Sequence, residues 1–235
     1  SLMAAFATGP PIAPKPITPR LFEDALRLYP VSSDAAFRTI REGYLPTGQF
    51  DTAYRLIRRY CQVDPKNERA SRLKGRLEEL AQAHQRFKQL TEQLIKGEIT
   101  TAETCELAAV CETLEMRQEA ASYWKRVLSA EDLTARNARD GCIALQRLRE
   151  FELAMAFLRR VPEAVWVTFT EVELVASAGL AQTCGDSQLA LSMFQCALQT
   201  YPSSGRVWLG VALYYYEVGN EAQAYECMCA AVRCG

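Results

Sequence analysis

A repeat of about 34 residues is the feature that most constrains the fold of this chain. Residues 185–198 and 219–232 align along their whole length, and a small residue recurs at the same place in five copies of the pattern. Its steps are 67, 34, 36 and 34 residues, of which 67 is about two periods: Ala53, Ala120, Ala154, Ala190 and Ala224. A glycine five residues before three of these alanines can end one helix and reverse the chain, and the alanine lets the next helix approach closely. Because one such hairpin cannot bury its own apolar face, the copies must stack. The sequence therefore predicts an all-α chain, an α-α superhelix of stacked antiparallel helical hairpins.

The residues around these alanines resemble the tetratricopeptide repeat (TPR) family. The unit at 171–204 matches the family pattern best, through Ala178, Gly185, Ala190, Phe194, Ala197 and Pro202. The unit at 34–67 matches through Tyr44, Gly48, Ala53 and Pro65, and the unit at 205–235 through Trp208, Tyr215, Gly219, Ala224 and Ala231. The units near 101–134 and 135–170 are degenerate, and the second lacks the turn glycine. The resemblance implies a TPR-like solenoid that binds another protein.

Residues 66–97 depart from this pattern and separate the two parts that resemble the family, 34–65 and 101–235. Apolar residues recur there every seven positions, with Leu77 and His84 between them: Leu73, Leu80, Phe87 and Leu94. From Lys66 to Lys96 there is no proline and no glycine apart from Gly75, and a glycine inside a helix costs about 1 kcal/mol relative to alanine. One long helix over 66–96 is therefore favoured over a hairpin.

Two further segments have a local signature. Residues 9–19 contain five prolines, which predict a flexible, extended leader over residues 1–20 before a helical-repeat domain over 21–235. Thr18 and Pro19 read as the start of a helix. The run 165–175 is rich in β-branched residues, but Thr170-x-x-Glu173 is a capping box, so we expect a helix that begins at Glu171.

Composition excludes several classes of protein. The chain has 235 residues, 49% of them hydrophobic, and a net charge of −1, which argues against a nucleic-acid binder. No run approaches the roughly 20 apolar residues that span a membrane, and no signal peptide is visible. Ser1-Leu2-Met3 reads as a cloning scar, so an upstream targeting segment could have been removed.

Nine scattered cysteines, an odd number, indicate reduced thiols in a cytoplasmic protein: Cys61, Cys105, Cys111, Cys142, Cys184, Cys196, Cys227, Cys229 and Cys234.

Candidates for catalysis are few. The only histidine is His84, at an apolar position of a helical pattern, where a packing role is the simpler interpretation. Cys227 and Cys229 point about 200° apart on a helix, so they do not face one zinc ion together with Cys234. There is no glycine-rich phosphate loop. We therefore expect no enzyme, no cofactor and no metal.

The resemblance to the TPR family implies a concave groove lined by the first helix of each hairpin. Six residues fall on its groove positions: Arg38, Arg136, Arg139, Arg147, Arg206 and Tyr216. Three acidic residues also do so, namely Glu42, Glu112 and Glu217, which leaves a weak bias toward an acidic peptide. An ordinary solvated face is the alternative interpretation. Tyr216 belongs to an aromatic cluster with Trp208, Tyr214 and Tyr215, of which Trp208 and Tyr215 are expected in the core.

These observations predict a protein-protein interaction scaffold or adaptor that binds a peptide or protein partner in the groove. The alternative is an interaction or regulatory module of a larger protein, with the catalytic or membrane domain elsewhere. Self-association through the C-terminal end of the array, around residues 227–234, competes with the groove as the interface. If the groove is the site, Arg139→Glu and Tyr216→Ala should each weaken partner capture with little loss of stability.

Overall fold

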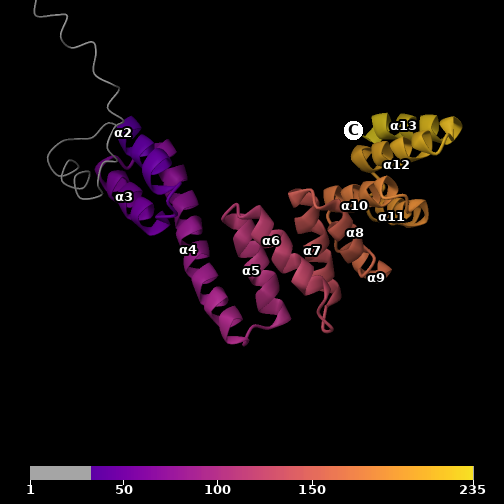
Figure 1. Ribbon diagram of the computed structural model, residues 1–235. Coiled ribbons are helices and arrows are strands. Elements are labelled where there is room, and N and C mark those ends of the chain that lie inside the picture. Colours follow the sequence, from indigo (N-terminus) through magenta and orange to yellow (C-terminus); the bar gives the residue numbers. More distant parts are fainter. Residues whose placement is uncertain (1–32, 235) are drawn as a thin grey trace, which may run out of the picture. The chain divides into compact units, whose positions relative to one another are not determined.

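The computed structural model describes residues 33–234 of the chain (Figure 1). Helices make up 79% of these residues, and no strand occurs among them, which confirms the prediction of an all-α fold. The leader over residues 1–20 and the helix start at Thr18-Pro19 lie outside the described residues. Contacts divide the chain between Lys88 and Gln89 into two compact units, which are described separately.

The first unit begins with α2 (Ser33–Arg38), which continues as the π-helical segment η1 (Thr39–Tyr44) and is followed by α3 (Phe50–Val63). These helices bury Ile40 and Ile57 completely. The long helix α4 (Glu68–Lys96) starts in this unit and runs without a break past its boundary, as the seven-residue pattern predicts. His84 packs edge-on against the ring of Phe50, with 5.4 Å between ring centroids, so the packing interpretation of this residue is confirmed.

The second unit contains four antiparallel helical hairpins in succession (Figure 1). They are α5 (Thr101–Thr113) with α6 (Arg117–Leu128), α7 (Ala135–Leu148) with α8 (Phe151–Leu158), α10 (Glu171–Thr183) with α11 (Ser187–Thr200), and α12 (Gly205–Glu217) with α13 (Glu221–Cys234). The short helix α9 (Glu163–Trp166) follows α8 and begins directly after Pro162, inside the irregular unit at 135–170.

The recurring alanines lie where the two helices of a hairpin touch. Four of the five are fully buried and the fifth nearly so: Ala53, Ala120, Ala154, Ala190 and Ala224. In the second unit, Ala154 and Ala190 belong to a continuous core that includes Trp124 and Phe157, whose rings meet edge-on with centroids 5.9 Å apart. The alanines that recur at the repeat spacing are therefore buried residues, as the repeat predicts.

The start of α10 has the predicted capping geometry. The hydroxyl of Thr170 accepts a hydrogen bond from the backbone N–H of Glu173, whose carboxylate accepts the N–H of Thr170 at 2.9 Å. The helix begins at Glu171, so the β-branched run before it does not form a strand. The reciprocal bonds satisfy two of the backbone N–H groups that a helix start leaves unpaired.

The aromatic cluster of α12 differs from the expectation. Tyr214 is the buried member, and its hydroxyl donates a hydrogen bond to the carbonyl of Ser187 at 3.3 Å. Trp208 and Tyr215, which the sequence places in the core, are only half-buried. Trp208 instead donates its indole N–H to the carbonyl of Pro202 at 2.9 Å, at the edge of the repeat. Consensus positions alone therefore do not identify the buried ring.

Each hairpin turn has the same backbone geometry, including the turns that lack glycine. Gly48, Gly185 and Gly219 have positive φ values of 67°, 80° and 80°, and Glu115 and Arg149 adopt the same left-handed conformation at 61° and 65°. In each of these turns the N–H of the next residue bonds to the carbonyl five positions back, at 2.8 to 3.0 Å. The two degenerate repeats therefore keep the turn geometry without a glycine at this position.

Replacing Arg149 by glycine is expected to stabilise the second unit by about 1 kcal/mol, because a side chain in the left-handed region costs roughly that much. Thermal unfolding of the full chain measures the change. The matched control is Arg126→Gly, at an exposed position inside α6 with ordinary helical geometry. That glycine should destabilise by about 1 kcal/mol, so a shift of the same sign in both variants would refute this explanation of the turn.

Candidate functional site

The first helices of the second unit form one continuous surface, which we call the groove face. Helices α5, α7, α10 and α12 contact one another in this order. The side-chain amide of Gln146 on α7 donates to the hydroxyl of Ser177 on α10 at 3.0 Å. One repeat further on, the amide of Gln182 donates to the carboxylate of Glu217 on α12 at 2.6 Å. The groove positions implied by the TPR resemblance thus lie side by side across neighbouring repeats.

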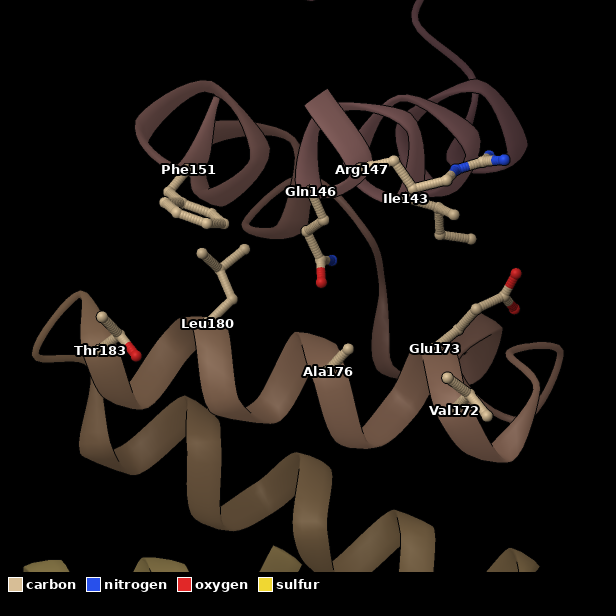
Figure 2. A pocket seen from close by; sticks show the side chains of 9 residues that line it. All are labelled: Ile143, Gln146, Arg147, Phe151, Val172, Glu173, Ala176, Leu180 and Thr183. Atoms are coloured by element: carbon tan, nitrogen blue, oxygen red, sulfur yellow. The ribbon is translucent and has the colours of Figure 1, made fainter. Parts of the chain in front are cut away.

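A pocket of about 570 Å³ opens on this face between α7 and α10 (Figure 2). Its lining is mostly apolar and is completed by four polar or charged side chains: Ile143, Phe151, Val172, Ala176 and Leu180, with Gln146, Arg147, Glu173 and Thr183. Figure 2 shows Phe151 and Leu180 facing one another at one end. Phe151 is 49% exposed and Val172 53% exposed, so large apolar surface stays in contact with water in this pocket. A concave apolar site with a few polar groups is the usual form of a ligand pocket.

Gln146 supplies a polar group in the middle of the pocket. Its amide nitrogen is committed to Ser177 and to the sulfur of Cys142, at 3.0 and 3.2 Å. The residues that the structure describes offer no hydrogen-bond donor to its carbonyl oxygen, which points toward α10 in Figure 2. This oxygen is therefore available to accept an N–H from a ligand.

Arg139 on α7 forms an ion pair with Glu173 on α10, and Glu173 lines the pocket. The guanidinium of Arg139 donates to the carboxylate of Glu173 at 3.0 Å and to Asp140 at 3.3 Å, and it lies 5.2 Å from the ring centroid of Phe169. Burial by itself raises the pKa of Glu173, but hydrogen bonds from Thr170 and the nearby Arg139 charge more than offset this. The pKa of Glu173 is consequently below its ordinary value, and the carboxylate is ionised at neutral pH.

The arginines of the groove face differ in whether they have a partner. Arg136 approaches Asp140 at 3.9 Å, and Arg206 approaches Glu171 at 3.8 Å. Arg147 is exposed, lines the pocket, and forms no ion pair with any residue in the described part of the chain. The basic bias counted from the sequence is therefore mostly neutralised on the folded surface.

The remaining predicted site residues fall in different places. Arg38 is exposed at the end of α2, in the first unit. Tyr216 is 65% exposed on α12, where Leu209 and Leu213 are also exposed on the same helix, at 46% and 52%. Spacings of four and three residues put these three side chains on one face of α12. The structure thus brings Arg136, Arg139 and Arg147 together on α7, with Arg206 and Tyr216 on α12.

Sequence reasoning missed the apolar part of the site. Ile143 and Val172 occupy groove positions just as the arginines do, so apolar residues at these positions were a usable signal. Ala176 and Leu180 extend the same stripe along α10 by one helical turn each. Phe151 is the first residue of α8, the second helix of its hairpin. It lines the pocket because α8 starts directly beside the end of α7, and no residue pattern in the sequence predicts this contact.

The cysteines do not form a reactive cluster. All nine are free thiols. Burial raises the pKa of Cys105 and of Cys142 to about 11, and that of Cys111 to about 12, so these thiols stay protonated at neutral pH. Between residues 33 and 234 no three histidine, cysteine or carboxylate side chains gather as metal ligands would.

Comparison with known proteins finds similarity in structure only. No family model and no curated protein matches the sequence. The solved structure of MamA described as MamA MSR-1 C2 is 14% identical, with a TM-score of 0.51 over 90% of this chain and 97% of its own. Two further crystal structures of MamA are 15% and 14% identical, with TM-scores of 0.46 for both. Their alignments cover 80% and 84% of this chain and 90% and 89% of theirs.

None of the helices within residues 33–234 is both long enough and apolar enough to cross a membrane. An identity of 14% carries information about fold alone. The hairpins, the shared turn geometry and this likeness together identify the fold of the chain as a TPR-like all-α solenoid.

Proposed function

We propose that this chain is a protein-interaction scaffold that binds a peptide segment of a partner protein on the groove face. The observation that carries the proposal is the apolar pocket between α7 and α10. Its volume of about 570 Å³ lies within the roughly 300–1,000 Å³ typical of ligand sites. The same face would serve a stand-alone adaptor or a module of a longer protein.

The surface next to the pocket supports a ligand longer than one side chain. Leu209, Leu213 and Tyr216 expose apolar area along α12, which contacts α10. Tyrosine is common among the residues that dominate binding energy, because its ring offers a large area with a polar end. Tyr216→Ala is therefore expected to weaken capture, without the loss of a buried contact.

Filling the pocket tests the proposal directly. Ala176 is exposed on the pocket wall, so Ala176→Trp places an indole in the cavity without overpacking the core. Mass spectrometry identifies the partners that the wild-type chain captures from source-cell extract. The amount of these partners that is captured should fall at least tenfold with this variant. That factor corresponds to about 1.4 kcal/mol of binding free energy.

The control is Ala222→Trp, because Ala222 is also an exposed helical alanine but lies on α13, away from the pocket. It should capture the same partners as the wild type. Retention of every partner by Ala176→Trp would refute the groove face as the binding site.

A second candidate surface lies on α13. Tyr225, Met228 and Val232 are 71%, 45% and 80% exposed on this helix, which is an unusual amount of apolar area for one helix face. Self-association through this face competes with the groove proposal. Val232→Glu should abolish dimers in analytical ultracentrifugation if this surface is used.

A further inference from the structure

We infer that the pocket selects a partner segment in which a large apolar side chain lies close to an acidic side chain, whose carboxylate binds Arg147. This inference rests on the proposed function and names the chemistry of the ligand. It follows from how charge is distributed around the pocket, from the placement of the apolar lining, and from the hydrogen-bonding groups that remain available.

The first observation is a single uncompensated charge. Two charged side chains line the pocket, Arg147 and Glu173. Glu173 is paired with Arg139 at 3.0 Å, and both of these side chains are mostly buried, so the negative charge is locally neutralised. Arg147 has no acidic partner in residues 33–234 and is exposed. A ligand entering the pocket therefore meets one net positive charge.

The second observation is that the apolar and charged parts of the pocket are separated. Phe151 and Leu180 face one another at one end (Figure 2). The guanidinium of Arg147 extends toward the other end, above Ile143. An apolar side chain that packs against the exposed ring of Phe151 leaves a neighbouring carboxylate within reach of that guanidinium, which can hold it with two parallel hydrogen bonds.

The third observation favours an internal acidic side chain over a chain terminus. The groove face continues from the pocket to α12 on one side and to α5 on the other, so a bound chain can extend in both directions. The available carbonyl oxygen of Gln146 accepts hydrogen bonds and therefore suits a backbone N–H of the ligand. A terminal carboxylate would need several donors around it, and the pocket offers one guanidinium.

Selection from a random library of twelve-residue peptides displayed on phage tests the inference, with the full chain immobilised. The wild type is expected to enrich peptides that carry Asp or Glu within about two residues of a large apolar side chain, at least tenfold over peptides with Lys or Arg there. Arg147→Glu should invert this preference in favour of Lys and Arg. The control is Arg149→Glu, because Arg149 lies two residues away in the turn, and Glu115 already occupies the equivalent turn position.

The outcomes separate this inference from the proposed function. If the enriched peptides lose binding with Ala176→Trp but show no charge preference, or keep it in Arg147→Glu, the inference is wrong and the groove proposal stands. If no enriched peptide depends on Ala176, both are wrong. An inverted preference in Arg149→Glu would also overturn the assignment to Arg147.

Discussion

Replacing Arg139 by glutamate is expected to lower the free energy of unfolding of the second unit by about 3 kcal/mol. Breaking one side of a buried ion pair costs roughly 3–5 kcal/mol, and the pair of Arg139 and Glu173, with 22% and 25% of each side chain exposed, lies toward the lower end. The new carboxylate would face Glu173 and Asp140 and would lose the position over the ring of Phe169. Urea denaturation measures the difference.

Arg136→Glu is the matched control for this substitution. Arg136 is one turn away on the same helix, its side chain is 87% exposed, and its one ion pair is a 3.9 Å contact. Exposed pairs of this kind contribute roughly 0–1 kcal/mol. Equal losses in the two variants would show that Arg139 has no special structural role.

For Arg139→Glu, the ion pair with Glu173 leads us to expect a larger loss of stability than the groove position alone predicts. The guanidinium of Arg139 is already committed to α10, so loss of capture by Arg139→Glu would report damage to the fold as well as to the groove. Tyr216 and Arg147, which are exposed, remain suitable for testing binding.

The same ion pair predicts a pH dependence. The pKa of Glu173 is lowered in the folded state, so its contribution to stability is fully present above its unfolded value of about 4.3. The contribution is lost as the pH falls through the folded pKa. The stability difference between wild type and Glu173→Gln should therefore be constant from about pH 6 to pH 8 and should shrink below about pH 4. A difference that grows toward acid would contradict this sign.

Gly141→Ala is expected to destabilise the second unit by about 2 kcal/mol, although alanine is the better helix former. A Cβ at this position of α7 would lie 2.8 to 3.0 Å from three ring atoms of Phe157, which is fully buried on α8. The ring cannot move aside without disturbing its edge-on contact with Trp124. For a unit of this size the melting temperature should fall by about 4–8 °C.

The control for this prediction is Gly179→Ala, inside α10, where an added Cβ would have no atom within 4 Å. That substitution should stabilise by up to about 1 kcal/mol, because the helix gains propensity without a clash. Stabilisation by both substitutions would show that α7 and α8 have room to adjust.

Much of the fold could be predicted because it depends on short-range patterns. The alanine spacing identified the helix contacts, Thr170 and Glu173 fixed the start of α10, and the seven-residue pattern indicated the continuous helix α4. Each of these signals lies within one or two turns of the structure that it determines. The turn at Arg149 was harder to predict from the sequence. The backbone hydrogen bond that stabilises it joins the N–H of Glu150 to the carbonyl of Leu145 and does not depend on the side chain of Arg149.

The site was harder to predict because it depends on pairs of residues that are far apart in the sequence. Whether an arginine is free or neutralised is decided by partners such as Glu173, 34 residues from Arg139. The pocket likewise needs the spacing between α7 and α10 as well as their residues. Groove positions, taken from the repeat frame alone, could not give the charge that this face presents.

The central claim is that a partner segment occupies the pocket between α7 and α10. Methyl NMR spectra of the full chain, titrated with the segment that it captures, test this directly. We predict the largest shifts at the methyl groups of Ile143, Val172 and Leu180, with smaller shifts at Leu209 and Leu213. Shifts confined to Met228 and Val232 on α13 would contradict the account and assign binding to that helix instead.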